Sequence, residues 1–213
     1  MDRGRRLYDR WADRWSLFRL LSRVAFAGRE AELRRRSVAS LGLSTGERVL
    51  DLGAGPGVNA ERLGRPVGPT GGVVCLDYSE RMTARARDRV RDAPAPTGVV
   101  RGDAARLPFP DESFDAAYAS LSLTAMPDAA GAVREVRRVL RPGGRFAVLD
   151  ARPYDGWPHR LLNPVNDRVN AWATNWHPDT DVVGLLREVF PRVDARRHNH
   201  GSFVTAVARR APE

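Results

Sequence analysis

The 213-residue sequence contains no lysine and a single cysteine, and none of its apolar stretches approaches the roughly 20 residues that a membrane-spanning helix needs. Without lysine, the protein has no side chain for Schiff-base chemistry and no lysine general base. The lone Cys75 excludes an internal disulfide and any metal site built from several cysteines. No uninterrupted apolar core follows the basic start at residues 1–6, so a secretory signal is not expected. These absences predict a reduced, soluble, cytoplasmic protein without a structural metal.

All 35 basic side chains are arginines, and together with 26 acidic residues they give a formal net charge of +9. The excess lies mainly near the N-terminus: residues 1–40 hold 11 arginines and five acids, whereas residues 41–150 hold 15 arginines and 14 acids. A basic arm favours anionic partners such as phospholipid headgroups, nucleic acid or a phosphorylated substrate. The same pattern is typical of a solvated helix face, and the sequence leaves both interpretations open.

Between residues 43 and 150, short apolar runs alternate with helical patterns. Strands are expected at 48–52, 73–76, 98–101, 114–123 and 145–150, and helices at 80–90, capped by Ser79, and at 129–140. This alternation predicts an α/β fold, in which a doubly wound, mostly parallel sheet has helices on both faces. The length fits one domain spanning residues 1–213, with residues 43–150 as its core.

The two flanking segments have a different character. Near the N-terminus, apolar residues recur at three- and four-residue steps and predict an amphipathic helix; they are Leu7, Trp11, Trp15, Phe18 and Leu21. A second helix is expected at 29–41. After residue 151, an aromatic-rich segment at 154–178 precedes a helix at 182–190 and two strands, 193–197 and 202–208, which we expect to pair as a hairpin.

The most informative segment is the glycine-rich loop at 53–57, which follows the strand 48–52. Glycines at such a place let the backbone turn sharply and approach a ligand without an intervening Cβ. The helix that follows offers free N–H groups, which suit a carboxylate or phosphate. Gly55, Gly57 and Ala60 also match a relaxed dinucleotide fingerprint, so the loop alone does not separate NAD from other nucleosides.

Two acidic residues end the strands that follow the loop. Asp77 ends the second strand, where a carboxylate can accept both ribose hydroxyls of an adenosine ligand. Asp103 ends the third strand at the same edge of the sheet and can accept a hydrogen bond from the adenine amino group. Each acid is also compatible with a plain capping or loop role, but their order behind the glycine loop favours ligand binding.

Five motifs, in register, resemble those of class I S-adenosylmethionine-dependent methyltransferases: Val49–Gly57, Asp77, Gly102–Ala104, Leu107–Asp115 and Leu140–Gly144. They look most like the branch that includes ubiquinone/menaquinone C-methyltransferases and phospholipid N-methyltransferases. The resemblance covers roughly residues 46–150. It implies S-adenosyl-L-methionine as the cofactor and a Rossmann-like sheet of about seven strands, mostly parallel with an antiparallel last strand.

The resemblance also implies roles for individual residues at the cofactor. The methionine half would lie on the loop formed by Gly53, Ala54, Gly55 and Gly57. Asp51 would fix that loop or meet the cofactor's amino group, and Asp77 would take the ribose hydroxyls. Around the adenine, the implied contacts come from Tyr78 or Met82 and from Gly102, Asp103 and Ala104.

Further roles fall at the reacting end. Ala119 and Ser120, at the end of the fourth strand, would line the methionine side near the transferred methyl group. A Tyr-Asp pair near the N-terminus often helps close the site in this family, and Tyr8 with Asp9 resembles that element. The resemblance thus makes residues 1–42 a helical lid and residues 151–213 the segment that faces the substrate.

The cofactor carries its own electrophile, so the protein must hold a nucleophile in line and exclude water. An acceptor that needs a general base would find candidates in His159 and His177, which lie in the aromatic-rich segment. Each histidine is also, and more simply, explained as a surface or packing residue. We expect a small-molecule or lipid-like acceptor; whether N, O or C is methylated is left open.

Other functions remain alternatives at this point. An NAD-dependent oxidoreductase fits the loop and Asp77 but not the motifs at 103–115. A nucleic-acid methyltransferase fits the charge, but the fourth strand ends in Ala119-Ser120-Leu121-Ser122 and not in an Asn/Asp-Pro-Pro-aromatic run. A relative that binds the cofactor without transferring its methyl group is a third alternative. The basic arm adds one expectation, a peripheral contact with an anionic surface.

Overall fold

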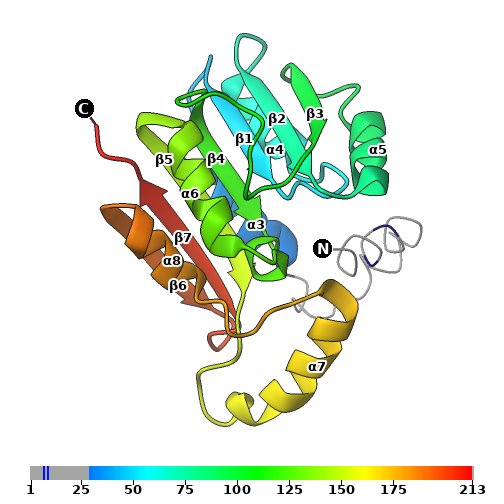
Figure 1. Ribbon diagram of the computed structural model, residues 1–213, viewed down its shortest axis with the longest axis vertical. Coiled ribbons are helices and arrows are strands. Elements are labelled where there is room, and N and C mark those ends of the chain that lie inside the picture. The colour runs from blue at the N-terminus through cyan, green and yellow to red at the C-terminus, as the bar shows by residue number, and fades with distance from the viewer. Residues whose placement is uncertain (1–6, 8, 10–28, 213) are drawn as a thin grey trace.

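The computed structural model describes Leu7, Asp9 and residues 29–212. Its centre is a seven-stranded sheet in the order β3-β2-β1-β4-β5-β7-β6 (Figure 1). The strands are β1 (Arg48–Leu52), β2 (Gly72–Asp77), β3 (Thr97–Arg101), β4 (Phe114–Ser120), β5 (Leu140–Ala151), β6 (Arg192–His198) and β7 (Phe203–Arg209). β7 pairs antiparallel with both β5 and β6, and the other pairings are parallel. The predicted sheet, with its antiparallel last strand and its terminal hairpin, is confirmed.

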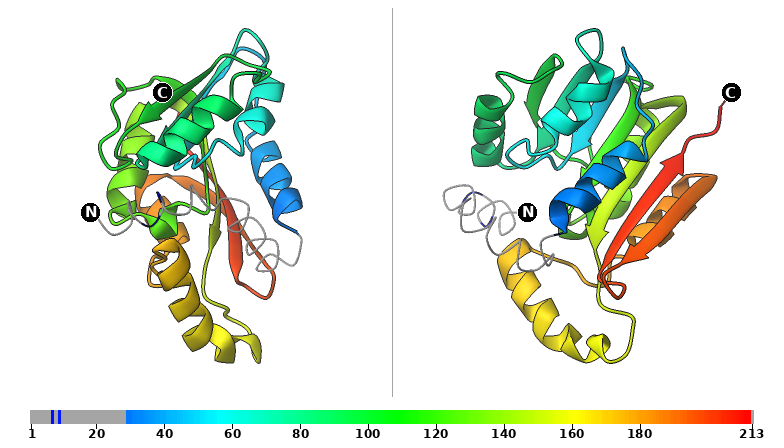
Figure 2. Two further views of the ribbon diagram at one scale, coloured as in Figure 1. Left: turned by 90° about the vertical axis from the view of Figure 1, so that its right-hand side faces the viewer. Right: turned by 180° about the vertical axis from the view of Figure 1, so that it is seen from behind.

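Helices cover both faces of this sheet. They are α3 (Glu30–Ala39), α4 (Ala60–Val67), α5 (Glu80–Arg89), α6 (Ala129–Val139), α7 (Asn163–Thr174) and α8 (Val182–Val189), with short 3-10 helices η1 (Leu123–Ala125) and η2 (His159–Leu162). Leu63 of α4 shares one buried cluster with Val49 of β1, whereas Val136 of α6 shares the other with Leu50. Figure 2 shows α3 and α4 on the face opposite to α6 and α8. Alternate residues of one strand therefore supply two separate cores, as period-2 geometry requires.

β1 is the point where the strand order reverses, because its neighbours β2 and β4 lead the chain in opposite directions across the sheet. In open α/β sheets, ligands bind outside the carboxyl ends of the strands at such a switch point. The residues that follow β1, β2, β3 and β4 are therefore brought to one edge of the molecule. This edge carries the candidate site.

Several predicted boundaries move for identifiable reasons. β4 ends at Ser120 and not at residue 123, because Leu121 adopts a left-handed conformation with φ +54° while its N–H donates to the Leu149 carbonyl. β5 begins at Leu140 and not at residue 145, with an irregular pairing to β4 across the turn that contains Gly143. Helix α3 ends at Ala39, and α5 begins as predicted after Ser79, whose hydroxyl accepts the Met82 N–H at 3.1 Å.

Helix α7 is absent from the sequence prediction, which treats residues 154–178 only as an aromatic-rich segment. The helix has proline near its first turn, a position where the missing N–H costs nothing, and ends at Asn175 in the left-handed conformation. The sequence prediction describes this segment by its aromatic, proline and asparagine content, although Leu162, Val165 and Val169 recur at three- and four-residue steps. Figures 1 and 2 show α7 extending away from the sheet.

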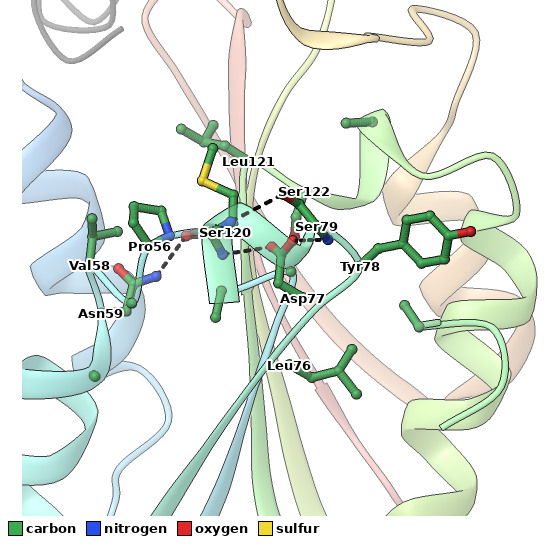
Figure 3. A pocket seen from close by; sticks show the side chains of 18 of the residues that line it. Pro56, Val58, Asn59, Leu76, Asp77, Tyr78, Ser79, Ser120, Leu121 and Ser122 are labelled. Carbon is green, nitrogen blue, oxygen red and sulfur yellow. Dashed lines mark hydrogen bonds between the residues drawn. The ribbon is translucent and has the colours of Figure 1, made fainter. Parts of the chain in front are cut away.

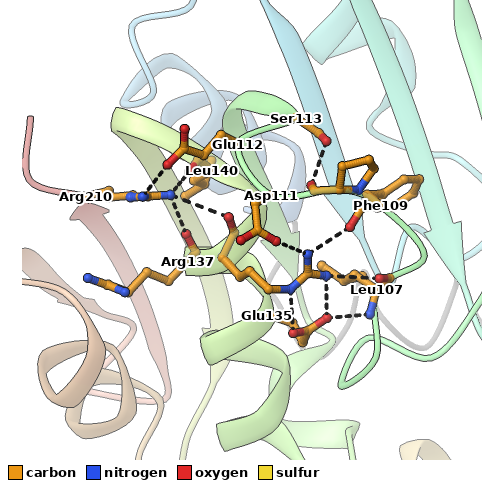
Figure 4. A network of polar contacts seen from close by, with 11 residues as sticks. Leu107, Phe109, Asp111, Glu112, Ser113, Glu135, Arg137, Leu140 and Arg210 are labelled. Atoms are coloured by element: carbon orange, nitrogen blue, oxygen red, sulfur yellow. Dashed lines mark hydrogen bonds and ion pairs between the residues drawn. The ribbon is translucent and has the colours of Figure 1, made fainter. Parts of the chain in front are cut away.

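A dense polar network fixes the segment 107–115 at the opposite edge of the sheet (Figure 4). The guanidinium of Arg138, at the end of α6, donates to the carbonyls of Leu107 and Phe109 at 3.1 and 2.9 Å. The same group pairs with Asp111 at 2.7 Å and with Glu135 at 2.8 Å. Hydrogen bonding to Glu135 and Asp111 raises the pKa of Arg138 further above its usual range. The segment 107–115 is therefore held in place by hydrogen bonds and ion pairs within the protein.

No helix within residues 29–212 combines the length and the apolar character that a membrane crossing requires.

Candidate functional site

A cleft of about 1050 Å³ opens at the carboxyl ends of β1, β2, β3 and β4 (Figure 3). Of the residues predicted at the cofactor, the structure brings the following to its wall: Gly53, Ala54, Gly55, Gly57, Asp77, Tyr78, Met82, Gly102, Asp103, Ala104 and Ser120. Segments that sequence reasoning did not assign also contribute, among them α3 and the end of α7. The cleft therefore combines four strand ends with two helices from outside the motif region.

The glycine loop is shaped by two different constraints. At Gly53, φ is +65° and an added Cβ would lie 2.6 Å from the Ser122 Cβ, so no side chain fits there. At Gly55, φ is +55° but an added Cβ would meet nothing within 4 Å. The first glycine is required by packing against the end of β4. The second leaves open space on the cleft side, where a ligand can approach the backbone closely.

Asp77 ties the end of β2 to this loop. One carboxylate oxygen accepts the Gly55 N–H at 2.8 Å, and the other accepts the Ser79 N–H at the same distance. Burial raises the pKa of Asp77, and these backbone hydrogen bonds oppose that rise. Each oxygen retains lone-pair capacity, because an ionised carboxylate offers about four acceptor positions. Asp77 can therefore hold the loop and still accept hydroxyl groups from a ligand.

The N-terminal element reaches the same place through Asp9. The Ser79 hydroxyl donates to the Asp9 carboxylate at 2.6 Å, next to Asp77. The negative charge of Asp9 contributes to the raised pKa of Asp77. Tyr8, the partner of Asp9 in the predicted closing element, lies outside the described residues. Contact of this segment with the rim of the cleft thus rests on Asp9.

Asp51 lies beneath the loop with no exposed surface. Among the residues that the structure describes, neither of its carboxylate oxygens has a hydrogen-bond partner. Burial raises the pKa of Asp51 to about 7, against the opposing effects of the Arg34 guanidinium and the Asn59 amide. No hydrogen bond joins the Asp51 carboxylate to residues 53–57 in this geometry, and both of its predicted roles stay predictions. An unpartnered buried carboxyl is costly and is satisfied best by a cationic donor.

Arg34 of α3 was not identified from the sequence. It is 8% exposed, lines the cleft, and its guanidinium donates to the Ser120 hydroxyl and to the Asn59 side-chain oxygen, the latter at 3.2 Å. A further hydrogen bond at 2.9 Å joins it to Glu30. Its neighbours Arg35 and Arg36 instead pair with Glu32 on the exposed face. Arg34 places a cation beside Asp51 at the end of the cleft below the glycine loop.

Hydrogen bonds with nearby backbone groups position two of the residues predicted to contact the adenine. Asp103 accepts the Ala105 N–H at 2.9 Å and faces the cleft, and the Gly102 N–H donates to the Asp77 carbonyl at 3.1 Å. Met82 is 3% exposed, whereas Tyr78 is 39% exposed at the mouth. The arrangement provides an apolar wall in Met82, a partly open aromatic in Tyr78 and a carboxylate at the far side.

The end of β4 supplies the wall near Arg34. Ser120 accepts from Asn59 at 3.0 Å, and Leu121 and Ser122 continue the wall. Leu121 adopts a left-handed conformation, which costs about 1–2 kcal/mol. This conformation turns the chain toward the cleft. Ala119 does not line the cleft, contrary to its predicted place. It is fully buried in the core, because successive side chains of a strand point to opposite faces.

Asp150, at the end of β5, stabilises the loop after β4. Its carboxylate accepts the Leu123 N–H at 2.9 Å and the Thr124 hydroxyl at 2.6 Å, and it has no exposed surface. Burial raises the pKa of Asp150, and its hydrogen bonds oppose that rise. In contrast to Asp51, this buried carboxyl is satisfied by the protein itself. Its role is to hold η1 and the adjoining cleft wall in place.

The two histidines predicted as bases do not lie in the cleft. His159 stacks on His200, with ring centroids 4.0 Å apart, on the segment before α7. His177 lines a smaller pocket that adjoins the cleft at Met126 and Pro127, and its backbone N–H donates to the Thr124 carbonyl at 2.8 Å. The sequence placed them near the substrate only by their position after β5. His159 lies in η2, before α7, whereas Asn175 at the other end of that helix lines the cleft.

Two remaining points concern metals and the aromatic pair at residues 172 and 176. Over the described residues, no group of three or more His, Cys, Asp or Glu side chains is placed to hold a metal ion. Trp176 is 5% exposed and packs as a buried residue. The side chain of Trp172 is outside the described part of α7.

Comparisons with known proteins agree with this geometry. A family model described as a methyltransferase domain matches residues 50–148. A ubiquinone/menaquinone biosynthesis C-methyltransferase from Pseudomonas entomophila is 32% identical over 89% of this chain and 82% of its own length. A 2-phytyl-1,4-naphtoquinone methyltransferase from Synechococcus elongatus is 36% identical over 75% and 71%.

Solved structures show the same fold. A methyltransferase from Thermotoga maritima, described as a possible histamine N-methyltransferase, superposes with a TM-score of 0.72 at 20% identity, covering 97% of this chain and 99% of that one. The NAD-dependent oxidoreductase and nucleic-acid methyltransferase alternatives are set aside by these relatives. The chain belongs to the class I S-adenosylmethionine-dependent methyltransferases, in the branch of the ubiquinone/menaquinone C-methyltransferases, and it transfers a methyl group to a small-molecule acceptor.

Proposed function

We propose that the cleft binds S-adenosyl-L-methionine in the orientation that the motifs imply and that the acceptor is a lipid-like ring of the quinone type. The observation that supports the cofactor assignment is a pair of opposite groups at and behind one end of the cleft. The Arg34 guanidinium lines the cleft, whereas the Asp51 carboxyl, which has no hydrogen-bond partner among the described residues, is fully buried behind the glycine loop and is not part of the cleft wall. An α-amino acid carries the complementary ammonium and carboxylate, so this end fits the methionine half.

The other contacts follow along the cleft. Asp77 would accept the ribose hydroxyls while it keeps its hydrogen bonds to the loop. Met82 and Tyr78 would flank the adenine, with Asp103 near its amino group and the backbone of Gly102 and Ala104 beside it. When bound, S-adenosylmethionine supplies a methyl group on a sulfonium cation; on transfer the sulfur keeps the bonding electron pair and a carbon acceptor loses a proton.

The chain's own contribution at the reacting end is to position the acceptor and exclude water. Beyond Ser120, the cleft wall includes the apolar residues Leu121, Ala125, Met126 and Pro127, with Ser122, Asp128 and Asn175 beside them. The apolar part of this surface fits a flat ring that carries a hydrocarbon chain. The names of the relatives, which act on quinones, support the same acceptor class.

We place the parts of the chain accordingly. Residues 43–150 form the cofactor-binding core, and residues 151–213 form the segment that faces the substrate. A closing role is proposed only for the part of residues 1–42 that precedes α3, because Leu33, Val38 and Leu41 are buried against the sheet. Asp9 on Ser79 supports such a contact at the rim. We further propose a cytoplasmic protein that works without a structural metal.

Calorimetry with two cofactor products tests the assignment of Arg34. S-adenosylhomocysteine contains the amino-acid end, and 5′-methylthioadenosine lacks it. Arg34→Met should weaken S-adenosylhomocysteine binding by roughly tenfold or more, since a charge-assisted hydrogen bond contributes about 1.5–3 kcal/mol. Binding of 5′-methylthioadenosine should be unchanged, and Arg34→Lys should restore part of the loss.

Arg35→Met is the matched control, because Arg35 is the adjacent arginine and pairs with Glu32 at the surface. It should leave both affinities as in the wild type. Equal loss of both ligands in Arg34→Met would mean that the substitution disturbs the cleft as a whole, and the carboxylate assignment would fail.

The acceptor class is tested by product analysis. The protein with labelled S-adenosylmethionine and a reduced 1,4-naphthoquinone bearing an apolar chain should give a product in which the label lies on a ring carbon. Transfer only to an oxygen or an amine would overturn the carbon-acceptor proposal. Cofactor binding with no transfer to this acceptor or to any component of a cell extract would favour a relative without methyl-transfer activity.

A further inference from the structure

Large apolar side chains are concentrated at the surface of one short segment. Trp157 is 71% exposed, Leu161 63%, Leu162 56% and Val165 66%. In the described part of the chain, the one other exposed large hydrophobic residue is Tyr78, at the cofactor cleft. Single exposed apolar residues need no explanation, but a contiguous group on a small protein marks an interaction site.

Helical geometry joins these side chains into one surface. The turn that contains Trp157 is closed by hydrogen bonds from Arg160 N–H to the Gly156 carbonyl and from Leu161 N–H to the Pro158 carbonyl. η2 then runs directly into α7. Residues three or four positions apart lie next to one another on a helix, which places Leu161 and Leu162 beside Val165. We call this surface, residues 157–168, the amphipathic tip.

The tip projects from the part of the chain that the structure describes. Figure 1 shows η2 and the first turn of α7 at the lower end of the molecule, beyond the ends of β5, β6 and β7. Both views in Figure 2 agree. None of the four apolar side chains belongs to the buried clusters on the two faces of the sheet. The surface is convex, so it fits a broad, soft partner better than it fits a rigid groove.

The polar residues of the tip are biased toward positive charge. Arg160 and Arg168 are exposed and form no ion pair with any described residue. The nearby Asp155 is already engaged by two arginines, with Arg152 at 2.8 Å and Arg197 at 2.7 Å. Asp167 is half-buried. Two free guanidinium groups therefore flank the apolar surface.

We propose that the amphipathic tip docks this protein on the surface of an anionic phospholipid bilayer. Trp157 would lie at the headgroup level, where indole rings are enriched, with the leucines and Val165 in the outer acyl region. Arg160 and Arg168 would meet the lipid phosphates, and the net charge of +9 would attract the whole molecule to the surface. The contact resembles that of an interfacial helix and does not span the membrane.

A second copy of the chain is a poorer partner for this surface. A stable protein interface uses about 20–30 residues on each side, and the tip offers four apolar side chains on a convex turn. Two identical tips would also bring their free arginines together. Lipid phosphates have the opposite charge, and acyl chains adapt to a convex apolar surface.

The docking site also has a defined relation to the cleft. Helix α7 begins at the tip and ends at Asn175, whose side chain donates to the Ala125 carbonyl at 3.1 Å and lines the cleft. One helix therefore connects the bilayer contact with the wall of the acceptor end. The inference does not depend on the acceptor, because binding to vesicles is measured without cofactor or substrate.

Vesicle sedimentation tests the proposal on the full chain. Wild-type protein should bind vesicles of phosphatidylcholine with 30% phosphatidylglycerol and bind weakly to phosphatidylcholine alone. The triple variant Trp157→Ser, Leu161→Ser, Leu162→Ser should lower the partition coefficient by at least about tenfold. Arg160→Gln with Arg168→Gln should lower it by about fivefold per arginine and only on the anionic vesicles.

Arg187→Gln with Arg192→Gln is the matched control. Both arginines are exposed and unpaired in the described structure, and Arg192 lies at the opposite end of β6 from the tip. This variant loses the same charge and should retain nearly all of the binding. If it loses as much as the Arg160 and Arg168 variant, attraction depends on total charge alone and the proposed site is wrong.

A local probe shows where the contact occurs. Cys75 is buried, so Val165→Cys can be labelled selectively with an environment-sensitive fluorophore. Its emission should shift to the blue on anionic vesicles, and the same label at Arg192→Cys should not respond. Vesicle binding by the triple variant equal to that of the wild type would overturn the proposal. So would a concentration-dependent dimer in sedimentation velocity that the triple variant abolishes.

Discussion

The amino ends and the carboxyl ends of the strands use similar polar residues for opposite purposes. At the amino ends of β4 and β5, the Arg138 guanidinium donates to two carbonyls and to Asp111 of the segment 107–115 and to Glu135 of α6. At the carboxyl ends, Asp51 is buried without a partner and Gly55 faces open space. At the amino ends, the polar groups are paired without a ligand. At the carboxyl ends, a ligand with matching groups would supply the missing partners.

The contrast has an energetic basis. A buried polar group that is satisfied by the chain stabilises the fold, and one that is left unpaired costs about 1–3 kcal/mol or more. Asp150 and Asp51 are both fully buried carboxyls at strand ends, but only Asp150 is satisfied by hydrogen bonds. Stability given up at Asp51 can be recovered on binding a cation, so we interpret it as part of the binding site.

The largest expected effect is at Asp77, at the carboxyl ends of the strands. Asp77→Ala removes the acceptor proposed for the ribose hydroxyls and should weaken S-adenosylhomocysteine binding by roughly 100-fold, as two charge-assisted hydrogen bonds are lost. The protein should stay folded with a free energy of unfolding lower by about 1–3 kcal/mol, because the Gly55 and Ser79 N–H groups lose their acceptor. Calorimetry and urea unfolding measure the two quantities. Unchanged affinity would contradict the ribose assignment.

The next largest effect is expected at Arg138, at the amino ends of β4 and β5, where the free energy of unfolding should change and the affinity should not. Arg138→Gln breaks hydrogen bonds to two carbonyls and two carboxylates and should lower the free energy of unfolding by about 2–3 kcal/mol. The dissociation constant for S-adenosylhomocysteine should stay within twofold of the wild type. If affinity falls as much as stability, the amino and carboxyl ends of the strands are not independent, and the comparison between them does not hold.

A smaller effect should appear in the pH dependence of binding. Burial raises the pKa of Asp51 to about 7, so the carboxyl is largely protonated at pH 6 and ionised at pH 8. An ammonium group binds the ionised form, so affinity for S-adenosylhomocysteine should rise about tenfold from pH 6 to pH 8 through this residue. Asp51→Asn should abolish that rise.

5′-Methylthioadenosine separates this contribution from that of Asp77, whose pKa is also raised. This ligand keeps the ribose but lacks the ammonium, so its affinity should not show the rise that depends on Asp51. A pH dependence of the same size for both ligands would assign the titration to another group.

The smallest effect is expected for the two histidines. His159→Ala and His177→Ala remove side chains that lie outside the cleft and should leave both cofactor affinity and turnover within about twofold of the wild type. Steady-state assays across pH 6–9 measure this. A large fall in kcat with either variant would restore that histidine as a base and require the chain to rearrange around it.

The sequence predicts most of the sheet, because the apolar runs of β1, β2, β4 and β5 are bounded by glycine, acid and turn residues that are readable locally. Most of the predicted cofactor residues line the cleft for the same reason, since they directly follow strands. Among the described candidates, Ala119 and Asp51 do not line it and are fully buried, because strand side chains alternate between the two faces of the sheet and only the packing shows which of them meet the cleft.

Arg34 and α7 could not be predicted for a different reason. Arg34 is one of three consecutive arginines, and only the packing of α3 decides that it turns inward while Arg35 and Arg36 pair with Glu32. Helix α7 has apolar residues at helical spacing, among them Leu162, Val165 and Val169, but they stand among proline and asparagine residues that are typical of loops. The place of Arg34 depends on how separate segments meet, and that of α7 on conflicting local signals; a single sequence settles neither.

The most direct measurement of the central claim is a calorimetric titration of the wild-type protein with S-adenosylhomocysteine and, separately, with NAD. The arrangement of Asp51, Arg34 and Asp77 predicts one S-adenosylhomocysteine site per chain and no binding of NAD, which lacks an amino-acid end. Binding of NAD, or the absence of S-adenosylhomocysteine binding to the folded protein, would contradict the assignment of this cleft.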